Sequence, residues 1–329
     1  MKPRILVTRE VFDETLEYLA QHCEVDSNQQ DVPLTPAALA ERLADKDGVM
    51  CSLTDRIDAA LLGAAPRLKA VANIAVGYNN IDTAACTARG IMATNTPGVL
   101  DDSTADLAWA LMLATARRLT EVESYIRDGQ WTGWRLKQWL GIDVHHATLG
   151  IVGMGRIGQA IAKRASGFDM RVLYHNRKPV APEVEQRLNA RYASLADLLR
   201  QSDFIILQVP YSKETHHLIG ASELQSMKRS AILVNSTRGG VVDDAALVAA
   251  LRAGTIRGAG LDVFENEPRL NPGFLELRNV VLAPHIGSST EATRRAMAMT
   301  AARNLVAALA GETPPNLVNR EVRSGSGER

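Results

Sequence analysis

The sequence predicts an α/β protein of two domains, each built on a parallel β-sheet with helices on both faces. The chain has 329 residues, whereas a typical domain holds roughly 100–200. Short apolar runs alternate with helical stretches in both halves of the chain, which is typical of parallel strands joined by helical crossovers. The alternation breaks at the turn-forming residues 95–98 and starts again at Thr148.

Composition excludes several classes of function. Basic and acidic residues number 37 each, and the chain has no long basic run, so we do not expect a nucleic-acid binder. Cys23, Cys51 and Cys86 lack the spacing of a disulfide scaffold or a zinc site, and no metal is expected. The start of the chain turns polar at Thr8, and the most apolar helix candidate, 105–116, is too short to span a bilayer. We therefore expect a cytoplasmic protein without a membrane partner.

The first domain is predicted from four apolar runs, which are 5–7, 48–51, 70–74 and 90–93. Residues 101–103 supply N-cap candidates for the helix that enters the second domain. A last helix, from about Glu291 to Leu309, has little sheet left to join, so we expect it to fold back on the first domain, with a frayed tail beyond Gly311. The expected domains are thus residues 1–98 plus about 291–329, and residues 99–290.

The second domain contains six stronger apolar runs, which are 149–152, 171–174, 204–209, 231–234, 258–263 and 280–283. Near-continuous apolar strands with helices between them predict a doubly wound parallel sheet, buried on both faces.

A glycine-rich turn follows the first of these strands directly and opens a helical pattern. Its glycines have the spacing Gly-x-Gly-x-x-Gly of a dinucleotide-binding turn. The first allows a tight turn, the second a close approach of the pyrophosphate, and the third close packing of helix and strand. We predict that Gly153, Gly155, Arg156, Ile157 and Gly158 contact the cofactor; a turn that binds nothing is the alternative. The pattern predicts two Rossmann/flavodoxin-like domains with a cleft between them.

The end of the second strand bears on the identity of the cofactor. An NAD site usually has an acidic residue about 20 positions after the glycines, where it binds the adenosine 2′-hydroxyl. This chain has Asn176, Arg177 and Lys178 instead, which favours NADP because two cations can bind a 2′-phosphate. NAD and a solvated basic turn remain the alternatives.

Three polar residues, Arg238, Glu267 and His285, each follow an apolar strand of the second domain. Carboxyl ends of parallel strands lie at one edge of a sheet, so we expect these side chains to meet there. Arginine binds carboxylates with paired hydrogen bonds, and a histidine beside a carboxylate is favoured in its protonated form. This set suits the reduction of a 2-keto acid by nicotinamide hydride, with His285 as the acid. The other histidines show no evident partner, and we expect surface or packing roles for His22, His145, His146, His175, His216 and His217.

Over nearly its full length the chain resembles the D-isomer-specific 2-hydroxyacid dehydrogenase family. The segments that carry the resemblance are 150–158, 234–240, 262–268 and 283–287. It implies that Arg238 binds substrate, that Glu267 pairs with the acid/base His285, and that Asp262 lies near the nicotinamide carboxamide. Further cofactor contacts are expected at Thr104, Val209, Pro210, Thr237 and Gly287.

Within that family the pattern is most similar to glyoxylate/hydroxypyruvate and 2-ketogluconate reductases. The similarity implies NADPH-dependent reduction of small 2-keto acids to D-2-hydroxy acids, with the N–H groups of Val76 and Gly77 binding substrate. It also implies a homodimer in which Trp139 reaches the partner subunit's pocket. Alternatively, Gly77 is a simple turn glycine and Trp139 a core residue. At the level of function, the alternatives are an NAD-linked enzyme of other substrate range and a non-catalytic NADP-sensing module.

Overall fold

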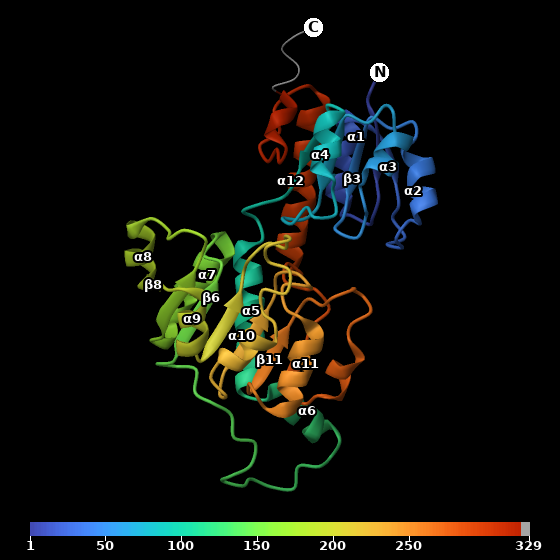
Figure 1. Ribbon diagram of the computed structural model, residues 1–329. Coiled ribbons are helices and arrows are strands. Elements are labelled where there is room, and N and C mark those ends of the chain that lie inside the picture. Colours follow the sequence, from blue (N-terminus) through green and yellow to red (C-terminus); the bar gives the residue numbers. More distant parts are fainter. Residues whose placement is uncertain (324–329) are drawn as a thin grey trace. The chain divides into compact units, whose positions relative to one another are not determined.

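The chain folds into two compact units, residues 1–100 with 289–329 and residues 101–288 (Figure 1). The computed structural model describes residues 1–323. Each unit is a parallel sheet with helices on both faces, so the predicted α/β fold class is confirmed.

The first unit has a five-stranded sheet in the order β2-β1-β3-β4-β5, the order of flavodoxin-like folds. Its strands are β1 (Arg4–Val7), β2 (Glu24–Ser27), β3 (Gly48–Cys51), β4 (Ala70–Asn73) and β5 (Met92–Thr94). Its helices are α1 (Asp13–His22), α2 (Pro36–Leu43), α3 (Ala59–Ala64), α4 (Thr83–Ala88), α12 (Glu291–Leu309) and the 3-10 turn η3 (Arg320–Arg323). The sequence analysis missed β2, because this edge strand pairs only with β1 and has no apolar run.

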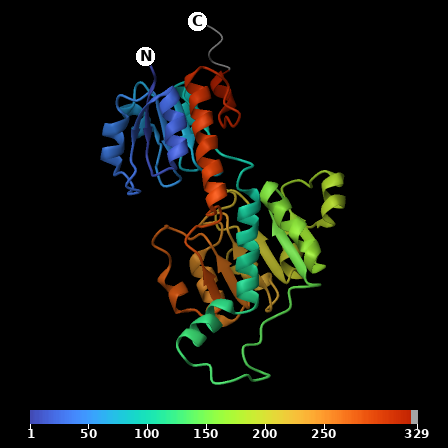
Figure 2. The same cartoon turned by 180° about the vertical axis from the view of Figure 1, so that it is seen from behind.

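The last helix, α12, covers one face of the first sheet. It lies alongside α1 and packs on β3 and β4 (Figure 2), where Ala301 and Leu305 join the buried core. The chain after it is not frayed as predicted, because Leu317 bridges to Thr94 and the Val318 N–H donates to Ala93 O at 2.8 Å. The end of the predicted frayed tail, residues 324–329, lies outside the described residues.

The second unit has a seven-stranded sheet in the order β12-β11-β10-β9-β6-β7-β8, a Rossmann sheet extended by one strand. Its strands are β6 (Thr148–Val152), β7 (Arg171–His175), β8 (Ala190–Tyr192), β9 (Phe204–Leu207), β10 (Ile232–Asn235), β11 (Gly258–Leu261) and β12 (Val280–Leu282). Its helices are α5 (Asp101–Ala116), α6 (Leu119–Arg127), α7 (Arg156–Ala165), α8 (Pro182–Leu188), α9 (Leu195–Gln201), α10 (Ala221–Ser226) and α11 (Asp244–Ala253), with 3-10 turns η1 (Ser166–Phe168) and η2 (Pro272–Glu276). The sequence analysis missed β8, a short edge strand with only one buried residue.

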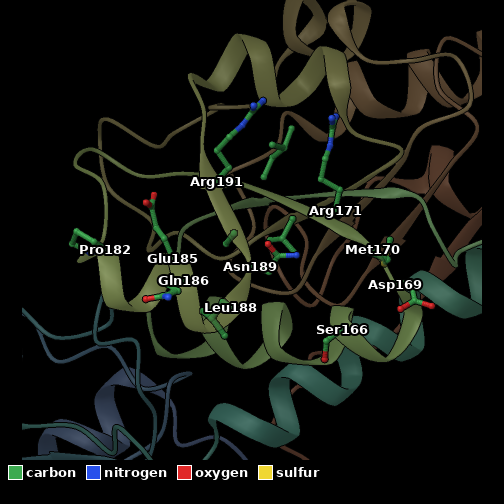
Figure 3. A pocket seen from close by; sticks show the side chains of 13 residues that line it. Ser166, Asp169, Met170, Arg171, Pro182, Glu185, Gln186, Leu188, Asn189 and Arg191 are labelled. Atoms are coloured by element: carbon green, nitrogen blue, oxygen red, sulfur yellow. The ribbon is translucent and has the colours of Figure 1, made fainter.

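A hollow opens at the side of the second sheet, where its outermost strands β7 and β8 lie next to α8 (Figure 3). Arg171, which lines it, is the first residue of β7. The hollow therefore lies toward the amino-terminal end of that strand, away from the carboxyl ends where ligands bind in open α/β sheets. Within residues 1–323, no helix combines the length and apolarity needed to cross a membrane.

We predict that Gly150→Ala destabilises the second unit by about 1–3 kcal/mol, because an added methyl overpacks the core. A Cβ at Gly150 would lie 2.3 Å from Ser202 Oγ and 2.6 Å from Leu198 Cδ2, and both side chains are fully buried. Gly167→Ala is the matched control, because a Cβ there meets nothing within 4 Å. Urea unfolding measures both variants, and equal stability of the two would contradict the packing described for β6.

Candidate active site

Apart from Thr104, which lies in α5, the predicted cofactor and catalytic residues of the second unit lie just beyond the carboxyl ends of its strands. They are 153–158 after β6, 176–178 after β7, Val209 and Pro210 after β9, Thr237 and Arg238 after β10, 262–267 after β11, and His285 and Gly287 after β12. Neighbouring strands pair in parallel throughout the sheet, so these segments share one edge. A hydrogen bond of 2.9 Å from Gln208 Nε2 to Ser236 Oγ joins the segments that follow β9 and β10.

Two of the three turn glycines are required by the protein's own packing. Gly153 has φ +108°, and a Cβ there would lie 2.3 Å from Gln208 O. A Cβ on Gly158 would lie 2.1 Å from Gly153 O, so this glycine lets α7 approach the turn. Gly155 differs, because a Cβ there meets no protein atom within 4 Å. It caps α7 without a side-chain hydrogen bond, which fits the close approach of a pyrophosphate to a helix N-terminus.

The segment proposed to select the cofactor has two parts with different contacts. Asn176 Oδ1 accepts a hydrogen bond of 2.8 Å from the Met154 N–H, so this amide braces the glycine turn. Arg177 and Lys178 are exposed at the same sheet edge. The pKa of Glu214 is held below its usual value, chiefly by a hydrogen bond from Ser212 and in part by the charge of Arg177.

The closest pairing of titratable groups among the predicted catalytic residues is that of His285 with Glu267. His285 Nδ1 lies 2.8 Å from Glu267 Oε2, and Glu267 Oε1 accepts from the Phe264 N–H at 2.9 Å. Burial acts to raise the pKa of Glu267, but the hydrogen bond and charge of His285 outweigh it, so this pKa lies below its usual value. Because an ionised carboxylate only accepts, Nδ1 donates and Nε2 is left to exchange a proton with a ligand.

Asp262 shapes the turn that carries His285. Its backbone oxygen accepts from the His285 N–H at 2.9 Å, and its carboxylate accepts from Ile286 N–H at 2.7 Å and Gly287 N–H at 2.9 Å. His285 has φ +56°, a left-handed conformation that such bonds help to maintain. Burial raises the pKa of Asp262, although the Ile286 N–H acts in the opposite direction. A Cβ on Gly287 would lie 3.4 Å from Thr104 Cγ2, so Thr104 belongs to the same cluster.

Arg238 is fixed by the loop that follows β10. Its Nη1 donates to Thr237 O at 2.7 Å, and Asn235 Nδ2 donates to Arg238 O at 3.2 Å. Asn235 Oδ1 also accepts from the Thr237 hydroxyl at 2.9 Å. Burial lowers the pKa of Arg238, and the negative charge of Glu267 acts in the opposite direction. The sequence analysis did not assign Asn235, which holds the loop that carries both predicted residues.

The predicted substrate loop of the first unit has its carbonyls occupied and its N–H groups available. Asn95 Nδ2 donates to Val76 O at 2.8 Å, and Asn73 Nδ2 donates to Gly77 O at 2.9 Å. Within the described part of the chain, the N–H groups of Val76 and Gly77 have no acceptor. Such N–H groups can bind an anion. The sequence analysis missed Asn73 and Asn95, whose only signal is an amide at or just beyond the end of a strand.

Trp139 packs within its own chain. Its ring lies 5.0 Å from that of Tyr125 between centroids, and the Arg118 guanidinium stands 4.9 Å above it. Trp131 and Trp134, in the same segment, are 60% and 80% exposed. The segment thus carries one packed and two exposed indoles.

His217 has a partner that is not evident in the sequence. Its Nε2 lies 2.5 Å from Glu265 Oε1. The two residues are 48 positions apart in the sequence, so no local pattern could reveal the pair.

A Rossmann sheet with an open glycine turn, and with an arginine and a histidine–carboxylate pair at the same edge, defines the class. This class is that of dinucleotide-dependent oxidoreductases, and the polar residues here are suited to transfer a proton and to bind an anion. Among residues 1–323, no group of three or more His, Cys, Asp or Glu side chains could hold a metal ion.

Comparison with known proteins identifies the family. Residues 109–287 match the model of the NAD binding domain of the D-isomer specific 2-hydroxyacid dehydrogenases. The chain is 52% identical over 326 residues to a glyoxylate reductase of Thermococcus onnurineus, covering 98% of this chain and 97% of that protein. It is similar to the crystal structure of an NADPH-dependent glyoxylate/hydroxypyruvate reductase from Sinorhizobium meliloti in complex with NADP and malonate, with a TM-score of 0.87, 35% identity and 98% coverage of each chain. The chain belongs to the D-isomer-specific 2-hydroxyacid dehydrogenase family.

Family membership confirms the resemblance inferred from the motifs. The protein is an oxidoreductase, which sets aside the alternative of a non-catalytic binding module. The roles of individual site residues remain predictions.

We predict that Gly155→Ala weakens NADPH binding by about tenfold or more, a loss of about 1.4 kcal/mol, without loss of stability. The added methyl meets no protein atom, so its effect falls on the ligand. Fluorescence titration gives the Kd and thermal unfolding gives the Tm, with Gly167→Ala as the control for a harmless methyl. An unchanged Kd in Gly155→Ala would show that the dinucleotide does not bind against this turn.

Proposed function

We propose that this protein is an NADPH-dependent reductase of small 2-keto acids, with glyoxylate and hydroxypyruvate as substrates. The observation that carries the proposal is the 2.8 Å hydrogen bond between His285 and Glu267, at the sheet edge that also holds the glycine turn. The names of relatives support it, since the chain is 52% identical to a glyoxylate reductase. The products are D-2-hydroxy acids, or glycolate in the case of glyoxylate. NADPH oxidation with glyoxylate, hydroxypyruvate, pyruvate, phenylpyruvate and 2-ketogluconate tests the substrate range, and no turnover with any of them would contradict the proposal.

His285 acts as the proton donor. Glu267 holds the imidazole through Nδ1 and, being ionised, favours its protonated form. The proton that leaves is therefore on Nε2, and it passes to the keto oxygen of the substrate. In the reverse reaction the same nitrogen accepts the hydroxyl proton.

In the second unit, Arg238 binds the anionic substrate. A guanidinium can bind a carboxylate through paired hydrogen bonds and also polarise the keto oxygen. Partial burial strengthens such a contact because water competes less for it. In the first unit, Asn73 and Asn95 hold the loop of Val76 and Gly77 through its carbonyls, which supports the prediction that the N–H groups of this loop bind an anion.

The cofactor is held by the glycine turn and by the residues after β7. Gly155 and the N-terminus of α7 bind the pyrophosphate, and Arg177 and Lys178 bind the 2′-phosphate of NADP. Thr104, Asp262 and Gly287, together with Val209, Pro210 and Thr237, contribute further contacts. When bound, NADPH supplies the hydride that reduces the keto carbon.

We also propose a homodimer formed through the tryptophan-bearing segment, in the cytoplasm. Trp131, Trp134 and Leu136 are large, apolar and 60%, 80% and 74% exposed, which supports burial against a second copy. The exposed indoles of Trp131 and Trp134 are the ones that bury their faces in this interface, whereas Trp139, which packs on Tyr125 and below Arg118 in its own chain, would have to leave those contacts to reach the partner subunit's pocket. A monomeric mass in sedimentation would contradict the dimer.

We predict that Glu267→Gln shifts the falling limb of the kcat/KM profile for keto-acid reduction to lower pH. The pKa of Glu267 lies below its usual value, so the residue is charged at neutral pH and favours protonated His285. Glutamine keeps an acceptor for Nδ1 but removes this charge, so the proton is lost at lower pH. His285→Gln should lower kcat by about 10²–10⁴-fold at every pH, because the acid is gone.

The control is Glu276→Gln, which removes an exposed carboxylate paired with Arg252. Its pH profile should coincide with that of the wild type. A Glu267→Gln profile that does not move, or wild-type turnover by His285→Gln, would contradict the assigned roles.

We predict that replacing both Arg177 and Lys178 by alanine lowers kcat/KM for NADPH by about 10–100-fold and leaves that for NADH nearly unchanged. Arg177 and Lys178 are exposed, so solvent screens their contacts and the pair together contributes about 1.4–2.8 kcal/mol, and NADH lacks the 2′-phosphate. The matched control replaces Arg171 and Arg191, which line the hollow beside β7 and β8 (Figure 3). Equal losses for both cofactors would favour the NAD-linked alternative.

A further inference from the structure

A second histidine–carboxylate cluster stands beside the two loops that carry Arg238 and Glu267. It consists of His217, from the segment between β9 and α10, Glu265 after β11, and Asp243 and Asp244 at the start of α11. These residues come from three separate segments of the second unit. None of them has a role in the proton transfer or anion binding described above.

The two loops touch without room for a side chain between them. A Cβ on Gly239, next to Arg238, would lie 1.8 Å from Phe264 O and 2.8 Å from Glu265 N. Phe264 in turn donates its N–H to Glu267 at 2.9 Å. A small change in the packing of these two loops would therefore displace both the Arg238 guanidinium and the Glu267 carboxylate.

His217 binds one loop with its backbone and the other with its ring. Its N–H donates to Gly240 O at 2.7 Å, two residues from Arg238. Its Nε2 lies 2.5 Å from Glu265 Oε1, two residues from Glu267. His217 has φ +50°, a conformation that a non-glycine residue adopts only when its surroundings hold it.

Glu265 is held a second time through its own backbone. Its N–H donates to Asp244 Oδ2 at 3.0 Å, and Asp244 is only 5% exposed. Burial raises the pKa of Asp244 to about 6, although the bond from Glu265 opposes this. The cluster also includes Asp243, whose Oδ2 lies 3.8 Å from His217 Nδ1. The ring of His217 thus connects the Glu265 side chain, after β11, to the loop that its own backbone N–H holds at Gly240.

We propose that His217 and Glu265 are positioning residues that fasten together the loops bearing Arg238 and Glu267. They act on the reaction through those two side chains and do not touch substrate. The proposal rests on the proposed function, because its kinetic readout is the reduction of a 2-keto acid. Loss of the pair lets the loops move apart, and a displacement of about 1 Å at a reacting group can cost about 10²-fold in rate.

The test compares kcat/KM for glyoxylate in three variants, two at His217 and one at the preceding residue, His216. His217→Leu removes the ring nitrogen and should lower kcat/KM for glyoxylate by about 10–100-fold, with NADPH Kd unchanged because the glycine turn is untouched. His217→Gln places an amide N–H within reach of Glu265 and should restore the rate to within about threefold of wild type. His216→Leu is the control and should keep the wild-type rate. The centroid of the His216 ring lies 3.9 Å from that of His217, but His216 makes its hydrogen bond to Tyr211 and not to Glu265.

A double variant tests whether the two residues act as one unit. In His217→Leu with Glu265→Leu, the loss should be no greater than that of the worse single variant, because each single change already breaks the pair. Losses that multiply, a full rate in His217→Leu, or a loss that His217→Gln fails to restore would overturn the proposal.

Hydrogen exchange separates this proposal from the proposed function. In His217→Leu the amides of 238–242 and 264–267 should exchange at least about tenfold faster than in wild type, whatever substrate the enzyme uses. Wild-type inactivity on every 2-keto acid would contradict the proposed function alone. Unchanged exchange in these two loops would overturn the fastening role even if the enzyme reduces glyoxylate.

Discussion

Parallel pairing of the strands in the second unit is the constraint on which the site depends. Every strand of that sheet runs in the same direction, so the residue after each strand lies at the same edge. Gly153 and His285 stand more than a hundred positions apart in the sequence but follow strands of one sheet. The strands are apolar and buried on both faces, so they hold the backbone in place, and the short loops after them contain the predicted cofactor-binding and catalytic residues.

Side-chain hydrogen bonds hold the loops at this edge: carboxylates accept from backbone N–H groups, and an amide donates to a backbone carbonyl. Asp262 binds the two N–H groups after His285, Asn235 holds the loop of Arg238, and Asp244 binds the N–H of Glu265. Hydrogen bonds to the Asp262 and Asp244 carboxylates are worth about 1.5–3 kcal/mol each, and a neutral bond such as that of Asn235 about 0.5–1.5 kcal/mol. The residues that hold these loops are thus different from the residues that are proposed to react.

Much of this arrangement could be predicted from the sequence, because burial and strand ends leave local signals. Apolar runs revealed most strands, and the glycine spacing and the residues after strands revealed 153–158, Arg238 and His285. The polar edge strands β2 and β8 left no such signal, since β2 has no fully buried residue and β8 has only one. Asn95 and His217 could not be predicted because their partners, 19 and 48 positions away, are brought close only by folding, and Asn73 could not be predicted because its bond to Gly77, four positions on, depends on the conformation of the loop.

We propose that NADPH bound at this sheet edge transfers a hydride to a 2-keto acid while His285 supplies the proton. The most direct measurement uses NADPH carrying deuterium at the transferred position of the nicotinamide, with glyoxylate as substrate. We expect glycolate with one deuterium on carbon, formed in equal amount to the NADPH consumed. Glycolate without deuterium, or NADPH consumption without glycolate, would contradict the account.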